Sequence, residues 1–414
     1  MAAATRQVVI AGAGQAGATA AAELRARGFT GSVTLVGAEE PLPYQRPPLS
    51  KGYLAGGTGT ADLLLRPASF YADQDIELVL GDAAAAIDRD GQCLTLASGR
   101  QLRYDRLVLA TGARPRPLPV PGAGLDGVLG LNTLTDAATL REGLADGLPL
   151  VVVGGGFIGL EAAATARALG QQVTVVEAGP RVMARAVSPT LSDHLTALHR
   201  GQGTRIMLGR DVVALHGDAA GRVRSVELDD RTLLPAGPVL VGIGVLPRTG
   251  LATAAGLAVG DGILVDRQLR TSDPAIHAIG DCARFPSPFA RRQVRLESVQ
   301  NATDQARCLA AVLCGEPEQY RAVPWFWTEQ HGARVQIAGL TQGSDRRVMT
   351  GHPSTGRFSV FCFRGEQLLG AESVNRTADH MITRRLLAGG DPGLSPETVA
   401  APGFDLKSFQ RQPV

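Results

Sequence analysis

Two short glycine-rich segments have the spacing that can bind the phosphates of a nucleotide. Both follow the pattern G-x-G-x-x-G, with Gly12, Gly14 and Gly17 in the first copy and Gly154, Gly156 and Gly159 in the second. Glycine lets the backbone turn tightly and approach a phosphate, and the helix that follows presents free N–H groups to the negative charge. The chemistry that this pattern predicts is the binding of a dinucleotide pyrophosphate at two places in the chain.

The acidic residue that ends each unit indicates which dinucleotide it binds. In the second copy Glu177 ends an apolar segment, where a carboxylate accepts hydrogen bonds from the adenosine ribose and repels a 2′-phosphate. This position predicts NAD rather than NADP, although Arg181 and Arg185 follow nearby and would weaken the preference. In the first copy the acid stands slightly later, at Glu39 or Glu40, and either ribose binding or a solvated loop explains it.

One lysine lies between the two glycine motifs. Among the 41 lysines and arginines only Lys51 and Lys407 are lysines, so 41 − 2 = 39 are arginines. Lys51 belongs to PYQRPPLSKGYL, residues 43–54. A chain that uses arginine almost everywhere but lysine here suggests a need for a compact ammonium, and the alternative is a surface lysine present by chance.

The glycine motifs need a strand before them and a helix after them, and the apolar pattern predicts these elements. The expected strand, helix and strand are residues 7–12, 18–28 and 32–37 in the first unit and 150–153, 160–170 and 172–177 in the second. Two complete β-α-β units predict a protein that binds two dinucleotides.

Three later segments extend this α/β pattern. Residues 107–115 and 239–247 are apolar strands that run into small-residue turns and proline, as expected where a chain crosses between domains. Residues 271–283 predict a strand that ends at Gly280-Asp281. Asp281 can bond to a polyol hydroxyl or, through water, to a phosphate, and an ordinary turn aspartate is the alternative.

The C-terminal part of the chain has a different pattern. Short strands with turns between them are expected at residues 333–340, 346–351, 357–364 and 366–375, followed by a helix at 377–388. The pattern predicts an antiparallel sheet with a helix.

Composition excludes several classes of protein. A chain of 414 residues is long enough for about three domains. The net charge of +2 argues against a nucleic-acid partner, and no apolar run approaches the roughly 18 residues of a membrane span. The five cysteines are scattered and the seven histidines follow no metal-ligand pattern, so no metal site is expected. The first residues lack the pattern of a secretory signal, which predicts a soluble cytoplasmic protein.

Seven motifs spread over nearly the whole chain resemble the FAD-dependent, NADH-using ferredoxin and rubredoxin reductases that serve bacterial oxygenases. They are GAGQAG, RPPLSKGYL, LATGARPRPLP, GGGFIGLEAAA, TSDPAIHAIGDCARF, RLESVQNATDQAR and PWFWTEQ, in that order. The resemblance implies an α/β fold with two Rossmann-like dinucleotide-binding domains and a C-terminal α+β interface domain. The FAD-binding domain would comprise residues 1–113 and 248–322, the NAD-binding domain residues 114–247, and the C-terminal domain residues 323–414.

The resemblance also implies roles for individual residues. Lys51 is expected beside the flavin and paired with Glu161, because a fixed ammonium stabilises the negative charge that hydride arrival builds on the ring. A surface lysine and a helix-start glutamate favoured by the helix dipole are the alternative. The residues expected to contact FAD are Gly12, Gly14, Ala16, Gly17, Glu39, Lys51, Ala84, Asp281, Val299 and Trp327, and those expected to contact NAD are Gly154, Gly156, Gly159, Glu161 and Glu177. Ordinary core packing is the alternative for Trp327.

Two positions depart from the family pattern. Ala38 stands where an acid is usual, and Asn132 stands where an arginine is usual. Glu39 is the expected substitute for the first, and the sequence offers no evident substitute for the second.

The absence of a dithiol directs the expected chemistry. Many related flavin reductases carry a C-x-x-x-x-C pair near the position of Lys51, and this segment has no cysteine. Without it, reduced flavin cannot pass electrons to a protein disulfide. The resemblance then implies hydride transfer from NADH to FAD and single-electron transfer to a two-iron two-sulfur ferredoxin of an oxygenase system. The alternatives are an NADH:rubredoxin reductase, an NADH oxidase, or a redox-signalling flavoprotein resembling apoptosis-inducing factor.

An acidic ferredoxin would need a basic docking surface. The candidates for an arginine-rich face are Arg66, Arg284, Arg291, Arg292, Arg295 and Arg307. A solvated arginine face without a partner is the alternative.

Overall fold

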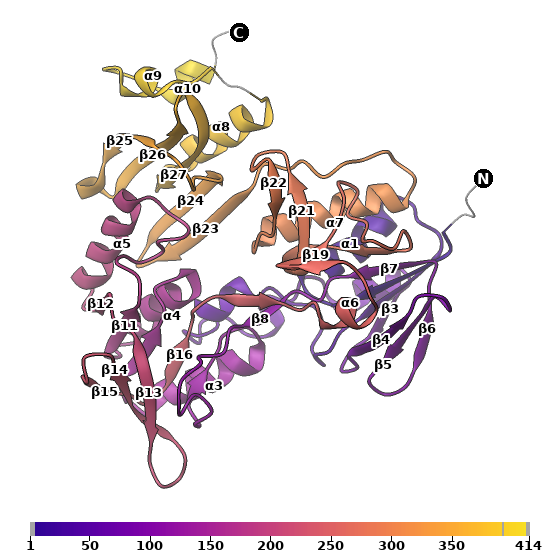
Figure 1. The fold of residues 1–414 in the computed structure, drawn as a ribbon, viewed down its shortest axis with the longest axis horizontal. Coiled ribbons are helices and arrows are strands. Elements are labelled where there is room, and N and C mark those ends of the chain that lie inside the picture. Colours follow the sequence, from indigo (N-terminus) through magenta and orange to yellow (C-terminus); the bar gives the residue numbers. More distant parts are fainter. Residues whose placement is uncertain (1–4, 391–392, 411–414) are drawn as a thin grey trace. The chain divides into compact units, whose positions relative to one another are not determined.

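The computed structural model describes residues 5–390 and 393–410, and these form two compact units (Figure 1). Unit 1 comprises the described residues up to Gln45 together with Thr60–Arg114 and Leu246–Ala322. Unit 2 comprises Arg46–Gly59, Pro115–Val245 and the described residues from Val323 onward. Each unit therefore contains segments that are distant in the sequence.

Unit 1 is built on a five-stranded parallel sheet with the order β20-β7-β1-β2-β3. The strands are β20 at Ile276–Ala278, β7 at Arg106–Leu109, β1 at Gln7–Ala11, β2 at Ser32–Val36 and β3 at Ile76–Val79. Their Val, Ile and Leu side chains are largely buried, which is typical of a parallel sheet covered on both faces. Helices α1 (Gln15–Ala26) and α7 (Val299–Leu313) pack against each other through buried alanines.

Two smaller sheets complete unit 1. One is antiparallel, with β4 at Ala84–Asp88, β5 at Cys93–Leu96 and β6 at Gln101–Arg103. The other has the order β18-β19-β21-β22, with β18 at Val259–Gly260, β19 at Gly262–Leu264, β21 at Ala283–Ser287 and β22 at Arg292–Val294. The short helices are α2 (Ala68–Asp73), α6 (Gly250–Ala254), η2 (Ala61–Leu63) and η3 (Gly280–Cys282).

Unit 2 contains a second five-stranded parallel sheet, of order β12-β11-β10-β16-β9. These strands are β12 at Arg205–Leu208, β11 at Val173–Glu177, β10 at Leu150–Val153, β16 at Val239–Val241 and β9 at Val128–Leu129. The accompanying helices are η1 (Pro47–Ser50), α3 (Leu134–Ala145), α4 (Phe157–Ala168) and α5 (Pro189–Gly201). A three-stranded antiparallel sheet follows, with β13 at Val212–Gly217, β14 at Val223–Leu228 and β15 at Leu233–Pro235. The short strands β8 (Ala113–Pro115) and β17 (Val245–Pro247) stand where the sequence passes from one unit to the other.

The C-terminal part of unit 2 is a five-stranded antiparallel sheet, drawn in orange to yellow in Figure 1, of order β23-β24-β27-β26-β25. The strands are β23 at Trp325–Gln330, β24 at Ala333–Gly339, β25 at Arg346–His352, β26 at Arg357–Arg364 and β27 at Gln367–Val374. The helical segments are η4 (Pro353–Thr355), α8 (Thr377–Ala388), α9 (Pro396–Ala400) and α10 (Leu406–Gln410). Helix α8 packs on β24 and β27, and this gives the sheet a buried face.

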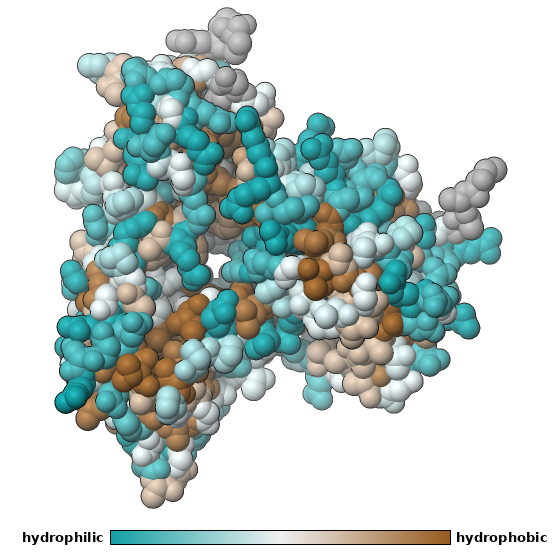
Figure 2. Space-filling model, in the orientation of Figure 1, coloured by the Kyte–Doolittle hydropathy of each residue, from teal (hydrophilic) through white to brown (hydrophobic). Residues whose placement is uncertain are grey.

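The exposed surface mixes polar and apolar residues. Figure 2 shows apolar patches of limited extent separated by hydrophilic residues, including one in the region of β13–β16. Leu233 of β15 and Val213 of β13 are among the exposed large apolar side chains. Within the described residues, no helix combines the length and the apolar character needed to cross a membrane.

The predicted β-α-β units and the antiparallel C-terminal sheet are confirmed, with shifts at the element ends. Both nucleotide-unit helices begin three residues earlier than expected, at Gln15 and Phe157, because each starts directly after the second glycine of its motif. The strand expected over residues 107–115 ends at Leu109, and the chain then turns before β8. The two antiparallel sheets of β4–β6 and β13–β15 were not predicted, because their strands carry short, irregular patterns.

Candidate functional site

The first glycine motif forms a tight loop between β1 and α1 in unit 1. A Cβ atom at Gly12, whose φ is +122°, would lie 2.1 Å from the carbonyl oxygen of Ala110. A Cβ atom at Gly17 would lie 1.9 Å from the carbonyl oxygen of Gly12. Space at Gly14 is open, with no other atom within 4 Å of the place that a Cβ would take. The loop therefore requires glycine at Gly12 and Gly17 for packing, whereas Gly14 leaves space beside the start of the helix.

The second motif repeats this geometry in unit 2. A Cβ atom at Gly154 (φ +103°) would lie 2.6 Å from the oxygen of Gly242, and one at Gly159 would lie 2.4 Å from the oxygen of Gly154. At Gly156 the nearest atom would be 3.7 Å away. The two loops are thus built to the same plan.

Both helix starts are free of side-chain caps. Gly14 is the N-cap of α1 and Gly156 is the N-cap of α4, and neither helix has an acidic residue in its first turn. The first N–H groups of such helices lack intrahelical partners and carry partial positive charge. An open space at an uncapped helix start is suited to a pyrophosphate.

Glu177 lies at the end of β11 and contacts the second glycine loop. Its two carboxylate oxygens accept hydrogen bonds from the backbone N–H groups of Gly155 and Gly179, each at 2.7 Å. Arg181 donates to the carbonyl oxygens of Val187 and Ala184. Its guanidinium therefore braces the following loop.

The acid expected in the first unit also has a defined place. Glu39 accepts a 2.5 Å hydrogen bond from the hydroxyl of Tyr44, and its carbonyl oxygen accepts the N–H of Gly81. The segment after β2 therefore runs beside the segment after β3, and Ala84 follows a few residues later at the start of β4.

Three of the predicted FAD contacts, Ala16, Asp281 and Val299, lie near the first glycine loop. A Cβ atom at Gly280, directly before Asp281, would lie 3.0 Å from the Cβ of Ala16. Strands β1 and β20 both end at this edge of the sheet, because each pairs in parallel with β7. Val299 is the first residue of α7, whose N-cap Ser298 accepts the N–H of Asn301. Gly12, Ala16, Asp281 and the start of α7 are thus close together, at the carboxyl ends of parallel strands where ligands of such sheets bind.

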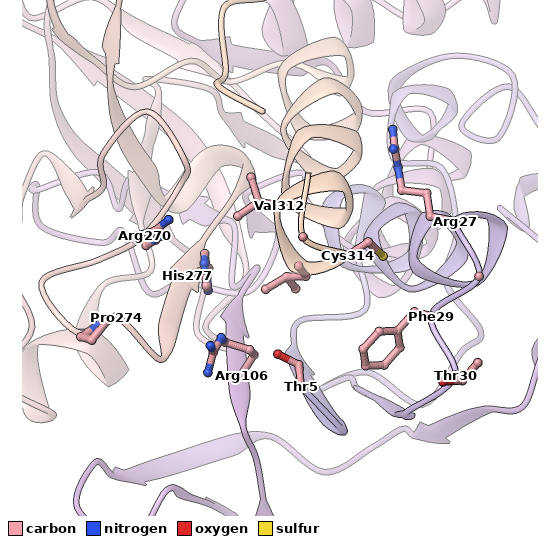
Figure 3. A pocket seen from close by; sticks show the side chains of 13 residues that line it. Thr5, Arg27, Phe29, Thr30, Arg106, Arg270, Pro274, His277, Val312 and Cys314 are labelled. Carbon is pink, nitrogen blue, oxygen red and sulfur yellow. The ribbon is translucent and has the colours of Figure 1, made fainter. Parts of the chain in front are cut away.

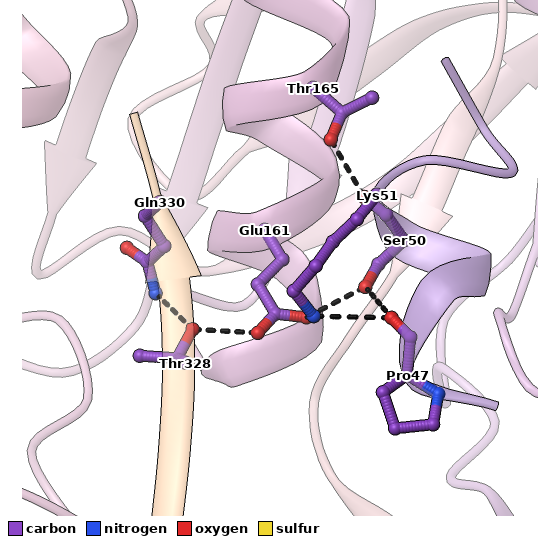
Figure 4. Close-up of polar contacts among 7 residues, drawn as sticks. All are labelled: Pro47, Ser50, Lys51, Glu161, Thr165, Thr328 and Gln330. Atoms are coloured by element: carbon purple, nitrogen blue, oxygen red, sulfur yellow. Dashed lines mark hydrogen bonds and ion pairs between the residues drawn. The ribbon is translucent and has the colours of Figure 1, made fainter. Parts of the chain in front are cut away.

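Lys51 and Glu161 form an ion pair within unit 2 (Figure 4). The Nζ atom of Lys51 lies 2.5 Å from Oε2 of Glu161, and it also donates to the carbonyl oxygen of Pro47 at 3.1 Å. Glu161 is only 6% exposed, whereas the Lys51 side chain is 26% exposed. The structure brings together the two residues for which the family resemblance implies a pair.

Two hydroxyl groups complete the surroundings of Glu161. Ser50 Oγ donates to Oε2 at 2.7 Å, and Thr328 Oγ1 donates to Oε1 at 2.7 Å. Thr165, one turn further along α4, donates to the carbonyl oxygen of Ser50. A buried carboxylate with three donors, one of them cationic, is held in one orientation. The part played by Thr328 was not predicted, because nothing in the sequence connects β23 with α4.

Trp327 lies on β23, next to Trp325. The two ring centroids are 5.3 Å apart, and the guanidinium of Arg384 lies 4.8 Å from the Trp325 centroid. Both tryptophans are partly exposed. Asn132, one of the departures from the family pattern, accepts a hydrogen bond from Arg46 at its carbonyl oxygen.

The five cysteines are all free thiols in the described part of the chain. Burial raises the pKa of Cys282 and Cys314, and it raises the pKa of Cys308 to about 12. None of these three has the lowered pKa of a reactive thiolate. The chain therefore has no disulfide through which electrons could pass.

The candidate docking arginines differ in environment. Arg291 in the β21–β22 turn and Arg292 at the start of β22 are exposed, and no acidic side chain of the described residues pairs with them. Arg307 pairs with Glu23 at 3.2 Å.

Arg295 does not fit an exposed face, because its side chain is 8% exposed and pairs with Asp261 and Glu297. Of the others, Arg66 is exposed beside the ring of Phe70 and Arg284 is half-buried.

Unit 1 has a cavity of about 620 Å³ that lies away from the first glycine loop (Figure 3). Its lining includes Arg106, Arg270 and His277, together with Thr5 and the loop after α1. Thr5 and Arg106 stand at the amino ends of β1 and β7, whereas the glycine loop follows the carboxyl end of β1. The cavity is therefore at the edge of the sheet opposite to the one where such folds bind dinucleotides.

Comparison with known proteins identifies the class that this fold and site define. The family model described as pyridine nucleotide-disulphide oxidoreductase matches residues 6–306, and the model described as reductase C-terminal matches residues 325–410. The chain therefore belongs to the pyridine nucleotide-disulphide oxidoreductase family, and the family and fold expected from the sequence are confirmed.

Individual relatives cover almost the whole chain. Rhodocoxin reductase of Rhodococcus erythropolis is 50% identical over 400 residues, which are 97% of this chain and 93% of that protein. The crystal structure of the ferredoxin reductase for the CYP199A2 system from Rhodopseudomonas palustris is 49% identical, has a TM-score of 0.94, and matches over 97% of this chain and 98% of that chain. The reductase structure in the covalent putidaredoxin reductase–putidaredoxin complex is 42% identical with a TM-score of 0.95, over 98% of both chains.

Membership of this family makes the chain an oxidoreductase that uses FAD and a nicotinamide dinucleotide. The residues present fit two dinucleotides, because both glycine loops leave open space at an uncapped helix start. The carboxylate of Glu177 lies beside the second loop, where an adenosine ribose would be met.

Proposed function

We propose that this protein is an NADH:ferredoxin oxidoreductase that supplies electrons to a bacterial oxygenase through a two-iron two-sulfur ferredoxin. The observation that carries the proposal is the ion pair between the partly exposed Lys51 and the buried Glu161, present in a chain with two dinucleotide loops and no disulfide. Relatives that match nearly the full length, a rhodocoxin reductase and a ferredoxin reductase for the CYP199A2 system, support a small redox protein as the acceptor.

FAD, when bound, supplies the chemistry by taking the hydride of NADH together with a proton and returning two electrons singly to two acceptor molecules. The chain's own residues bind and orient the reactants. Gly14 and Gly156 leave room for the pyrophosphates at the starts of α1 and α4. Glu177 is proposed to accept hydrogen bonds from the NAD ribose and to select against a 2′-phosphate.

Further roles follow the family resemblance. We assign FAD binding to the cluster of Ala16, Asp281 and Val299 together with Glu39 and Ala84, and a screening role to Trp327. Lys51 is proposed to present its ammonium to the flavin while Glu161 holds it in place. The domains are proposed to be residues 1–113 with 248–322 for FAD, 114–247 for NAD and 323–414 for the C-terminal domain.

The acceptor is proposed to dock on a basic surface that includes Arg66, Arg291 and Arg292. We choose these three arginines because their side chains are exposed. In addition, Arg291 and Arg292 have no acidic partner among the described residues. Exposed charges of this kind act mainly on the association rate, which falls as salt increases. Arg295 is left out of this surface because it is buried and neutralised by acids.

The proposal is tested by anaerobic stopped flow. The purified flavoprotein is mixed with NADH and then with a two-iron ferredoxin, and the flavin and ferredoxin absorbances are followed separately. We expect rapid flavin bleaching by NADH, then ferredoxin reduction at a second-order rate that falls with added salt. Bleaching without onward transfer to ferredoxin would remove the acceptor from the proposal, and transfer to rubredoxin instead would replace it.

A control separates the cofactor from the acceptor. NADPH at the same concentration should bleach the flavin much more slowly than NADH, because Glu177 lies beside the loop that binds the adenosine half. The absence of bleaching with either nucleotide would refute the proposed function as a whole.

A further inference from the structure

We propose that Thr328, Gln330 and His199 are positioning residues for the Lys51–Glu161 pair, which they fix through a hydrogen-bonded chain that ends on Glu161. The inference rests on the proposed function, because it takes that pair to act during flavin reduction. Thr328 and Gln330 belong to β23 and His199 belongs to α5, so this hydrogen-bonded chain joins three elements, of which β23 lies far from α4 in the sequence.

The chain consists of three consecutive hydrogen bonds. Thr328 Oγ1 lies 2.7 Å from Oε1 of Glu161, Gln330 Nε2 lies 3.0 Å from Thr328 Oγ1, and His199 Nε2 lies 2.9 Å from Gln330 Oε1. Figure 4 shows the first two of these bonds and the ion pair at their end. Thr328, Gln330 and His199 are each at most 1% exposed, so water does not compete for these groups.

The chemistry of the groups fixes the direction of every bond. An ionised carboxylate only accepts, so the Thr328 hydroxyl donates to Glu161 and its oxygen accepts from Gln330. Because Gln330 uses its amide N–H towards Thr328, its carbonyl oxygen faces His199 and requires a donor. His199 must therefore carry its proton on Nε2. Burial lowers the pKa of His199 to about 4, which leaves a neutral ring with a single N–H at neutral pH.

All three donors point towards Glu161. Aligned hydrogen bonds in a buried environment polarise one another, so the terminal bond to the carboxylate is stronger than an isolated one. The amide of Gln330 stands in the middle and does not pass protons on readily, which makes the chain a device for orientation rather than a proton path.

The hydrogen-bonded chain fixes Oε1, the oxygen of Glu161 that does not bond to Lys51. Oε2 accepts from Lys51 and Ser50, whereas Oε1 accepts from Thr328. Without Thr328 the carboxylate would lose the anchor that sets its rotation, and the ammonium of Lys51 would follow it. Catalytic groups that are displaced by a fraction of an ångström lose a large part of their effect.

The other end of the chain lies at the β23–β24 turn. The rings of His199 and His331 meet edge to face with centroids 4.6 Å apart, and His331 occupies the turn with φ +48°. Packing between the turn and α5 therefore holds His199 in place, and the antiparallel pairing of β23 with β24 holds Thr328 and Gln330.

The decisive experiment compares two Thr→Val substitutions in the FAD-loaded enzyme. Thr328→Val removes the donor to Glu161, and Thr341→Val is the matched control because Thr341 donates to another buried carboxylate, Glu372, at 3.0 Å. We expect Thr328→Val to lower the limiting rate of flavin reduction by about tenfold with the half-saturating NADH concentration unchanged, because orientation and not binding is lost. Thr341→Val should keep the full rate.

Two further variants keep the test decisive. Thr328→Ser retains the hydroxyl and should recover most of the rate, and Gln330→Met should lower the rate about threefold by removing the second bond.

An isotope measurement adds a further check. The primary kinetic isotope effect on flavin reduction by 4-deuterated NADH should rise in Thr328→Val, since the hydride step then limits the rate. Equal rates for Thr328→Val, Thr341→Val and the parent would overturn the inference.

A spectroscopic measurement tests the chain without turnover. In ¹⁵N-histidine NMR spectra, His199 should appear as the Nε2–H tautomer at neutral pH, and Gln330→Met should shift this signal. Observation of the Nδ1–H tautomer would refute the chain even in an active enzyme. A parent enzyme that NADH does not reduce would refute the proposed function instead, while the tautomer would still decide the arrangement of Thr328, Gln330 and His199.

Discussion

Lys51 is the residue whose chemical type matters most for the proposed reaction. Its ammonium is fixed by Glu161 and by the carbonyl oxygen of Pro47, yet 26% of its side chain stays exposed. A point charge held in this way can stabilise a negative charge that develops beside it. An arginine has a longer side chain that ends in a planar guanidinium, and it would not place a compact charge at the same point.

Lys51→Met should therefore slow flavin reduction by NADH. We expect a loss of about 100-fold in the limiting rate, which is the typical effect of removing one preorganised charge or donor. Lys51→Arg should recover part of this loss. The check is anaerobic stopped flow on preparations with equal flavin content, and a Lys51→Met rate close to that of the parent would exclude a role for the ammonium.

Glu177 is the residue that we propose to set the preference between nucleotides. Its carboxylate bonds to the backbone of Gly155 and Gly179 and lies beside the second glycine loop. Glu177→Ala removes the charge that repels a 2′-phosphate, so the ratio of kcat/KM for NADH to that for NADPH should fall by about tenfold or more. Steady-state assays with both nucleotides measure this ratio, and an unchanged ratio would show that another residue selects the nucleotide.

At the scale of elements, the first glycine loop contains one glycine that packing requires and another that leaves open space beside the helix start. Gly17 has no room for a side chain, since its Cβ would lie 1.9 Å from the oxygen of Gly12. Gly14 has open space and an ordinary negative φ of −82°. The two positions therefore make a matched pair of substitutions in the same loop.

Gly14→Ala should leave the apoprotein as stable as the parent but weaken FAD binding by about tenfold, because the added methyl group occupies space intended for the ligand. Gly17→Ala should destabilise the apoprotein itself, by about 2 kcal/mol or more, because α1 must move away from the end of β1. Thermal unfolding of apoprotein and FAD titration measure the two effects. Loss of apoprotein stability in Gly14→Ala would show that the space is not reserved for a ligand.

The two nucleotide units could be predicted from the sequence because their determinants are local. Each glycine motif, its strands and its helix lie within about 30 residues, and the ion pair followed from a family resemblance. The rest of the site was beyond prediction, because Thr328 and Glu161 are 167 residues apart and His199 and Gln330 are 131 residues apart. Contacts of that separation leave no periodic pattern in one sequence.

At the scale of the whole molecule, buried histidines make stability depend on pH. Burial lowers the pKa to about 4 for His199 and His380 and to about 3 for His277. These folded-state values lie below the unfolded value of about 6.5, so the unfolded chain binds the protons first. The stabilising contribution is present above about pH 6.5 and is lost as the pH falls from there towards about 4 for His199 and His380 and towards about 3 for His277.

His277→Leu should reduce this loss. Neither ring nitrogen of His277 has a hydrogen-bond partner among the described residues, so an apolar side chain removes a burial cost without breaking a bond. Between about pH 7 and pH 5 the variant should lose about 2 kcal/mol less stability than the parent. Thermal unfolding at both pH values provides the check, and equal losses would show that His277 is already protonated or partnered in the folded state.

The alternation of β23 has a consequence for how this protein can change in evolution. Trp325 and Trp327 stand on one side of the strand, and Thr328 and Gln330 stand on the other. Inserting or deleting one residue here would exchange the two sides, so the aromatic pair and the polar pair would be lost together. Relatives of this protein should therefore keep the length of this strand.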